Sequence, residues 1–573
     1  MKNEKQDVLG KLPIEAAEYI RLVVKYIRYR KRVRVDVQAE LAGHFEDAIR
    51  DCKDDEQRRA AVKKIIEEFG DAKMLAVLTR RAKKRCRPWW KKAVIKSFQT
   101  AGVIILLFIL YVGWFLSGKP RIDTDYLAKY NEMVRPAADD SLNAAPYYEK
   151  AAGLLVEDES GDCNSKSKTD FLRKDFDEAN DVEIEKIAKW LADNNDVFGL
   201  IEQGTQKPYF WRTYTGDPNQ PGRLLAMLMP NLAKYRSICY GLDWRAYIKA
   251  GNGNYAGAFD DIKTSYILGR HNKGNKTIIE NLVGISIEVK SVYTLRAVLD
   301  DFDIPSEYLT SWQNEFEQLT ADEDFTAQSF SGERMVMYDE IQRCFTKSRF
   351  GKEHLYLQNI VPLLNEPGGT PSLEGFVNYL FKDVKTDDFL KMGTAMTNFM
   401  FTHPNKEQTR QQADEFYSFW EKVAKKTPAQ IKREKIDIDK ISYEYMSKNM
   451  LLSMLAPAIG KIIQLHYRAK ADVESVVPTI AILRYKADKG ICPDGLQTLV
   501  DEGYLKTIPI DPFSDEPIKY KKAGDDFVLY CVGLNMVDDG GVMGKVDAET
   551  AQRGRGARMW ADDGDTIFWP VGK

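Results

Sequence analysis

The sequence predicts a mainly α-helical protein that contains one transmembrane helix and ends in a small α+β unit. Apolar residues recur at helical spacing along most of the 573 residues, a length that favours more than one domain. One long run, Ser97–Gly118, has no charged residue, whereas short β-type runs between turn residues gather after Asp511. The predicted parts are residues 1–92, 96–118, 119–448 and 449–573.

The first part, residues 1–92, is predicted to form three or four short helices between residues 12 and 80. Pro13 can serve as the first helical residue, and Asp71 can cap the last helix. Gly70 is expected just after the end of the third helix, where a left-handed conformation favours glycine. The apolar stripes comprise Ile14, Ala17, Ile20, Val24 and Ile27, then Val37, Leu41, Phe45, Ala48 and Cys52, then Val62, Ile65, Ile66 and Phe69.

This segment resembles the small cytoplasmic helical domain called HAAS, also known as the permease-prefix module. The matching residues cover about 70 positions and are Glu40–Leu41, His44, Glu46–Asp47 and Phe69–Ala72. A basic run before a membrane segment is part of the same likeness. The resemblance implies a regulatory or protein-docking role on the cytoplasmic side, without chemistry of its own.

A basic run and an apolar run together predict a single-pass inner-membrane protein of a bacterium. Arg80–Lys92 holds eight Lys or Arg and no acid, and the next 22 uncharged residues, Ser97–Gly118, would form a helix of about 33 Å. The positive-inside rule places residues 1–96 in the cytoplasm and residues 119–573 outside. A buried core helix is the alternative; the long polar segment ahead of the run argues against a cleaved signal peptide.

The third part predicts an irregular array of helix hairpins. A turn at Gly251–Asn254 separates two amphipathic runs in the manner of a tetratricopeptide (TPR-like) pair, with no second copy at a fixed period. A further turn is expected at Asp303–Pro305. The stretches Asn143–Ala151, Ile267–His271, Glu280–Glu288 and Ser331–Met335 resemble one largely uncharacterised family of bacterial membrane-anchored helical proteins, with an insertion at about residues 350–440. This resemblance implies architecture and location but no substrate.

No catalytic motif is present in the sequence. Zincin, nucleophile-elbow, Walker A and dinucleotide-binding patterns are absent, and the five His show no pair at ligand spacing. Glu288 and Glu333 lie in otherwise apolar helices; they could form a paired site, but capping or a buried ion pair with Arg270 or Arg334 is favoured. With a net charge of only −2, we expect no nucleic acid partner.

The last part predicts a long helix, a short helix and two strands. Pro457 can open the long helix and Pro478 should kink it. A short helix follows at Leu496–Val500. The strands are predicted at residues 518–522 and 527–533, joined by a turn at Gly524–Asp526.

This order resembles the periplasmic domain of the major pseudopilin of type II secretion. The matching residues are Tyr485, Gly490, Pro493, Leu496, Tyr504, Leu505, Pro509, Asp511, Pro512, Phe513, Pro517, Tyr520, Phe527, Leu529, Tyr530 and Gly533. Two departures are clear. The unit lies at the C-terminal end, away from any N-terminal membrane helix, and Met536 replaces a glycine while Met543–Asp562 interrupts the final loop.

In that family the loop after the second strand binds calcium, so the resemblance implies a calcium site here. The candidate oxygen ligands are Asn535, Asp538, Asp539, Asp562, Asp563 and Asp565. A solvated acidic loop is the alternative, because these residues are also common in turns. Cys492 and Cys531 are a possible disulfide pair.

The sequence thus predicts a non-enzymatic, membrane-anchored interaction or scaffold protein. Its expected partners are the lipid bilayer and proteins on both sides of the membrane. The expected role is to link an extracytoplasmic partner to a cytoplasmic regulatory domain or to a type II secretion-like assembly. The alternative is an extracytoplasmic hydrolase whose carboxylate site lies in the helical region. A converging pocket of Glu, Asp or His would favour the enzyme, whereas a concave apolar groove would favour peptide or protein binding.

Overall fold

A computed structural model of the chain confirms that the protein is mainly helical. It describes residues 8–85, 89–156, 172, 176, 179–274, 277–321, 330–347, 353–360, 402–456, 458–545, 560 and 563–571. The chain forms two compact units, Met1–Trp114 and Phe115–Lys573. Each unit is described by itself below.

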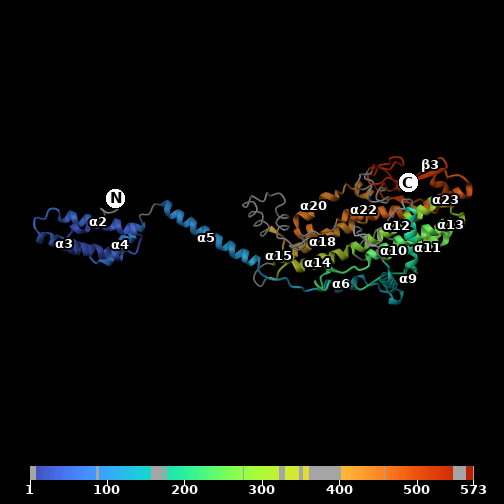
Figure 1. Cartoon of the computed structure of the whole chain (residues 1–573). Helices are drawn as coiled ribbons and strands as arrows, with labels where there is room; N and C mark the ends of the chain where they lie inside the picture. Colours follow the sequence, from blue (N-terminus) through green and yellow to red (C-terminus); the bar gives the residue numbers. More distant parts are fainter. Residues whose placement is uncertain are drawn as a thin grey trace. The chain divides into compact units, whose positions relative to one another are not determined.

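The first unit contains a bundle of four short helices around one small core (Figure 1). Its elements are η1 (Val8–Lys11), α1 (Ile14–Tyr26), α2 (Lys31–Ile49), α3 (Asp55–Phe69) and α4 (Ala72–Arg85). Two local signals are confirmed: Gly70 has φ +69° after α3, and the Asp71 carboxylate accepts the Met74 N–H at 2.9 Å. Tyr19 of α1 donates its hydroxyl to the Gly70 carbonyl, which ties that turn to the bundle.

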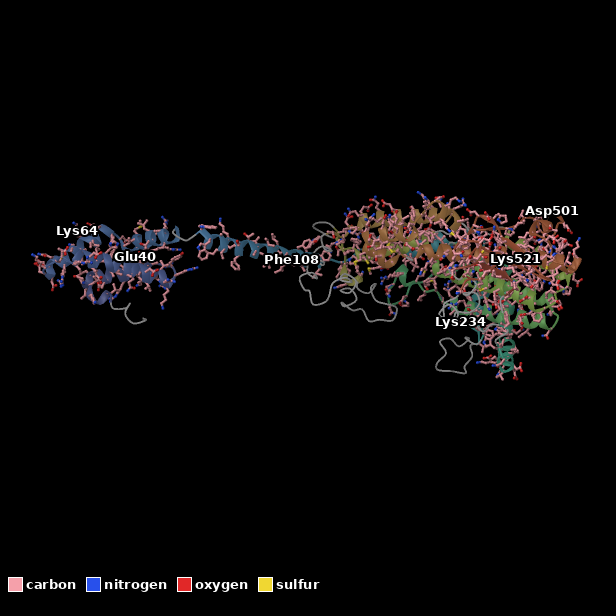
Figure 2. All side chains as sticks on the ribbon, turned by 90° about the horizontal axis from the view of Figure 1, so that it is seen from above. Glu40, Lys64, Phe108, Lys234, Asp501 and Lys521 are labelled. Atoms are coloured by element: carbon pink, nitrogen blue, oxygen red, sulfur yellow. The ribbon has the colours of Figure 1, made fainter. Side chains whose placement is uncertain are left out.

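The same unit ends in α5 (Trp89–Phe115), a single long helix. Its Ala93–Phe115 segment has a mean hydropathy of 2.1. Among the residues that the structure describes, this segment is the one helix that is long and apolar enough to cross a membrane. None of its apolar window is buried, and the side chains around Phe108 stand out from the helix (Figure 2). The helix stops about three residues before the predicted end, ahead of Gly118 with φ +95°.

The second unit begins with helices that pack around α10, α11 and α12. The elements in this half are α6 (Tyr126–Val134), η2 (Asp140–Leu142), α7 (Ala145–Leu154), α8 (Asp181–Asp193), α9 (Asn195–Thr205), η4 (Leu224–Ala226), α10 (Leu232–Gly251), α11 (Tyr255–His271), α12 (Ile278–Asp301), α13 (Ser306–Thr320) and α14 (Ser331–Cys344). The hairpin predicted at Gly251–Asn254 is present between α10 and α11. Its second helix buries Phe259, Ile262 and Tyr266, whereas Ala256 is exposed.

The second half of this unit adds shorter helices and the strands. They are α15 (Leu357–Ile360), α18 (Lys406–Val423), α19 (Pro428–Arg433), α20 (Ile438–Lys448), α21 (Met450–Leu455), α22 (Ile459–Glu474), α23 (Val476–Lys489), α24 (Leu496–Asp501), β1 (Ile510–Asp511), β2 (Glu516–Pro517), β3 (Lys519–Ala523), β4 (Asp526–Cys531) and β5 (Thr566–Trp569). The predicted long helix is divided into α22 and α23 at Ser475. Pro478 lies in the first turn of α23, where its missing N–H is tolerated.

The strands confirm the predicted hairpin and add a third member. β3 pairs antiparallel with β4 across the turn at Gly524, and β4 also pairs antiparallel with β5. Strand β5 was not expected from the sequence, because it follows a long interruption of the loop after β4. Asp511 links the preceding turn to this sheet, because its carboxylate accepts the N–H groups of Phe513 at 2.8 Å and Val532 at 3.0 Å.

The predicted disulfide between Cys492 and Cys531 does not form. Both thiols are free, as are those of Cys52, Cys239 and Cys344. Cys531 is fully buried at the end of β4, whereas Cys492 Sγ lies 3.6 Å from the Asp525 carbonyl. Cys86 and Cys163 lie outside the described residues.

A buried ion pair ties the terminal unit to the helical array. Nη1 of Arg296 in α12 lies 3.3 Å from Oδ1 of Asp472 in α22, and both side chains are almost fully buried. The Trp560 indole N–H donates to the same carboxylate at 3.2 Å, while the Arg296 guanidinium lies over the Phe568 ring. Helices α12 and α22 and the β5 segment therefore share one core.

Candidate functional site

A groove of about 780 Å³ lies in the second unit, between α20, α22 and the loops of the terminal unit. Apolar side chains make up most of its lining: Pro428, Ile431, Ile436, Ile438, Met446, Ala458, Ile459, Ile463, Phe513, Leu534 and Met536. Its size falls in the range of sites that bind small molecules or side chains of a peptide.

Helix α20 forms one wall of the groove. Asp437 caps it by accepting the Lys440 N–H at 2.9 Å. Ile438, Ser442 and Met446 recur every four residues, so they lie along one face of the helix, and this face lines the groove. None of the eleven residues of α20, all of them described, is buried. Ile438, Ser442 and Met446 are each half-buried, so this face of α20 is only partly covered by the rest of the unit.

Helix α22 forms the opposite wall and meets α20 at one end. A Cβ atom on Gly460 would lie 2.6 Å from Ile438 Cγ2, so only glycine allows this close approach. Beyond that point Ile459, Ile463 and Gln464 line the groove. Because Ile438 and Gly460 both line the groove, the two helices make this close contact within its lining.

The terminal unit completes the groove with its predicted turn and loop. Phe513 follows Asp511 in the turn, and the Asp511 hydrogen bonds hold it in place. Leu534, Asn535 and Met536 come from the loop after β4, where Met536 has φ +56°. The Lys432 ammonium donates to the Asn535 carbonyl at 3.4 Å, which joins the loop to α19.

Charges around the groove are balanced. Lys432 and Lys461 supply two cations, and Asp437 and Asp439 supply two anions. All four side chains are exposed. The groove therefore offers an apolar interior with a mixed polar rim, an arrangement suited to binding an apolar segment rather than a strongly charged one.

The loop predicted to bind calcium uses Asp565 as an internal anchor. Asp565 is buried, and its carboxylate accepts the N–H groups of Asp539 at 3.2 Å and Gly541 at 2.7 Å. Burial raises the pKa of Asp565, while these backbone donors act in the opposite direction. The residue thus holds the 539–542 segment against the start of β5.

The other predicted ligands are partly engaged with one another. Asn535 donates to the Asp539 carboxylate at 2.7 Å, whereas the Asp538 carboxylate accepts the Tyr530 hydroxyl at 3.1 Å. Asp563 is exposed, and Asp562 lies outside the described residues. Among the described side chains no group of three or more His, Cys, Asp or Glu is placed to hold a metal ion. The calcium site stays a prediction.

Glu288 and Glu333 each make contacts of their own. Glu288 forms a buried ion pair, as the sequence favoured, and its partner is Lys273 at 2.6 Å. Glu333 accepts the Ile278 N–H at 3.2 Å, and burial raises its pKa. Arg334 pairs with Glu421 at 3.1 Å.

Sequence reasoning missed a further buried carboxylate, that of Glu280. Glu280 is fully buried and accepts the Tyr214 hydroxyl at 2.9 Å, with the Arg212 guanidinium 3.5 Å away. Burial raises the pKa of the Tyr130 hydroxyl, and the negative charges of Glu280 and Glu333 act in the same direction. The sequence signal that could have identified Glu280 is its spacing of three residues from Thr277, with which it forms a capping box at the start of α12.

Two more buried carboxylates of the helical region serve structural contacts. The Asp339 carboxylate accepts the Leu224 N–H at 2.7 Å and the Arg343 Nε–H at 2.9 Å. Glu340 receives both arms of the Arg223 guanidinium, at 2.7 and 2.8 Å. These contacts hold the segment around η4 against α14.

Comparisons with known proteins add no assignment. No family model matches the chain, and neither a curated protein nor a solved structure matches it.

Proposed function

We propose that this chain is a non-enzymatic, single-pass interaction protein of the bacterial inner membrane, and that its groove binds an amphipathic helix of a partner protein. Residues 1–92 would lie in the cytoplasm and residues 119–573 outside. The half-buried face of α20 that lines the apolar groove carries the proposal.

The shape of the groove favours a helix as its occupant. Two helices, α20 and α22, line it with residues spaced four apart, and helices pack by placing the side chains of one between those of another. The mixed charges at the rim match the polar flanks of an amphipathic helix. Recognition of this kind uses apolar anchors one turn apart.

The contacts of the buried carboxylates favour binding over hydrolysis. Glu280 is occupied by Tyr214 and Arg212, and Glu288 by Lys273. The two aspartates that line the groove, Asp437 and Asp439, are exposed, and the Asp437 carboxylate caps α20. The hydrolase alternative has less support, because burial is what usually tunes a carboxylate to act as a general acid or base.

The resemblance of the terminal unit to a major pseudopilin makes a component of a type II secretion-like assembly a candidate partner. The matched Asp511 and Phe513 contribute to the groove in different ways: Asp511 holds the turn, and Phe513 lines the floor. The resembling segment is thus part of the proposed binding surface.

Photo-cross-linking in living cells tests the proposal. A benzophenone amino acid at Gln464, which lines the groove, should capture one protein partner through an amphipathic helix. At Leu465, the next residue of α22 and 40% exposed, it should not. Ser442→Trp should fill the groove and reduce capture by about tenfold or more, equivalent to ~1.4 kcal/mol.

Tyr443→Trp is the matched control, because Tyr443 is 73% exposed on α20 and does not line the groove. It should leave capture unchanged. Equal capture at Gln464 and Leu465, a cross-link that stays within one chain, or no effect of Ser442→Trp would contradict the proposal.

A further inference from the structure

Helix α4 presents an apolar patch to solvent. Met74, Val77 and Leu78 are 62%, 39% and 56% exposed, and they lie on one face because they are three and four residues apart. The opposite face supplies Ala72 and Ala76 to the core of the four-helix bundle. One face of α4 therefore packs in the core of the bundle, and the opposite face exposes a second apolar surface to solvent.

Basic side chains surround this patch. Lys73, Arg80 and Arg81 are exposed, and α4 contains no acidic residue. Lys83 points elsewhere, since its ammonium pairs with Glu40 of α2. An apolar patch flanked by cations is the arrangement of helices that lie on anionic lipid surfaces.

Chain connectivity keeps this patch close to α5. Only three residues, 86–88, separate the end of α4 from Trp89, so these helix ends lie at most about 14 Å apart. Leu78 precedes the end of α4 by seven residues, or about 10 Å along the helix axis. If α5 spans a bilayer, the patch stays within reach of that bilayer.

We propose that α4 docks on the anionic phospholipid surface of the membrane that α5 enters. Met74, Val77 and Leu78 would enter the interfacial layer, and Lys73, Arg80 and Arg81 would contact phosphate groups. The inference rests on membrane anchoring by α5, as proposed above, and it is independent of the groove.

The charge pattern favours lipid over a protein partner. Basic residues continue from α4 through Lys92 without an acid, so the positive charge extends to the start of the apolar segment. Each Lys or Arg near an anionic membrane adds to the attraction between the helix and that membrane. A protein would have to place its acidic surface within a Debye length of a membrane that already carries negative charge.

Spin labels on the full chain in lipid nanodiscs test the inference. A label at Leu78→Cys, in a background with Cys52, Cys86 and Cys163 replaced by Ser, should become accessible to oxygen and protected from a water-soluble nickel chelate. This should require phosphatidylglycerol and be absent in phosphatidylcholine alone. A label at Lys64→Cys, exposed on α3 (Figure 2), should stay accessible to the chelate in both lipids.

Charge reversal supplies the second arm. Arg80→Glu with Arg81→Glu should lower the docked fraction by about tenfold or more, whereas Lys63→Glu with Lys64→Glu on α3 should not. Protection of the Leu78 label in both lipids, accessibility to the chelate in both, or shielding from both reagents would overturn the inference.

A label at Phe108→Cys separates this inference from membrane anchoring itself. An oxygen-accessible Phe108 label beside a chelate-accessible Leu78 label contradicts only docking of α4. A chelate-accessible Phe108 label contradicts the anchoring by α5, and docking of α4 with it.

Discussion

At the residue scale, Asp243 is an ionisable group inside an apolar helix core. It lies on α10, is 1% exposed, and its carboxylate is 3.6 Å from Cys239 Sγ. Burial raises its pKa to about 7, opposed in part by Lys290 of α12, while Asp261 of α11 acts in the same direction as burial. Arg245 and Lys249 pair with Asp261 and neutralise much of that neighbouring charge.

The sign of the pH dependence follows from this raised pKa. Between about pH 4 and about pH 7 the folded chain keeps a proton on Asp243 that the unfolded chain releases. The contribution of Asp243 to the free energy of unfolding is therefore fully present below about pH 4 and is lost as pH rises through about 7. Asp243→Asn should remove this part of the decrease in stability between about pH 5 and about pH 8, which amounts to about 3 kcal/mol, and should lessen the accompanying decrease in melting temperature.

The matched control is Asp501→Asn, because Asp501 is exposed at the end of α24. Thermal unfolding in detergent, followed by circular dichroism at both pH values, provides the measurement. An unchanged pH dependence in Asp243→Asn would show that Asp243 is ionised in the folded chain at the lower pH.

At the element scale, two glycines set how closely α11 and α12 approach. A Cβ atom on Gly284 would lie 2.7 Å from the Gly269 carbonyl oxygen, and one on Gly269 would lie 2.9 Å from the Gly284 carbonyl oxygen. This close contact also brings Lys273 to Glu288 at 2.6 Å. The ion pair that replaced the expected arginine partners is thus a result of helix packing.

Gly284→Ala should destabilise the second unit by about 1–3 kcal/mol, because backbone atoms must move to admit the methyl group. Gly199→Ala on α9 should be neutral or stabilising by up to about 1 kcal/mol, since its Cβ would meet no atom within 4 Å and alanine favours a helix. Chemical denaturation of the two variants in detergent checks the opposite signs. Equal effects would contradict the close packing of α11 on α12.

At the scale of the whole molecule, α5 joins two units that each have a hydrophobic core. The first buries residues such as Ile20 and Phe45, and the second buries residues such as Tyr148 and Leu242. Separate cores are consistent with units that work on opposite sides of a membrane. The basic residues before α5 favour a cytoplasmic first unit.

Thiol labelling of spheroplasts tests this orientation. In a chain with Cys86→Ser and Cys163→Ser, Cys52 of the first unit should react with a membrane-impermeant maleimide only after the membrane is opened. The control places a cysteine at Lys521, exposed on β3 in the second unit (Figure 2), in the Cys52→Ser background. That cysteine should react in intact spheroplasts, and the reverse pattern would contradict the proposed orientation.

Much of the local structure was predictable because it depends on neighbouring residues. Helical spacing and the signals at Gly70 and Asp71 predicted the three or four short helices of the first unit, and the turn at Gly524 predicted the β3–β4 hairpin. The apolar run predicted α5, although the helix begins seven residues earlier and ends three residues earlier than expected. These features depend on contacts between residues a few positions apart, so they can be predicted from the sequence alone.

The tertiary structure alone decided which distant groups meet. Arg296 and Asp472 are far apart in sequence yet share one core, and β5 adds to the sheet after a long loop interruption. The groove likewise combines α20, α22 and the turn at Phe513. Sequence determined the helical class, the apolar segment and the turns, whereas packing determined the groove and the partners of buried carboxylates, because such contacts depend on how complete elements fit together.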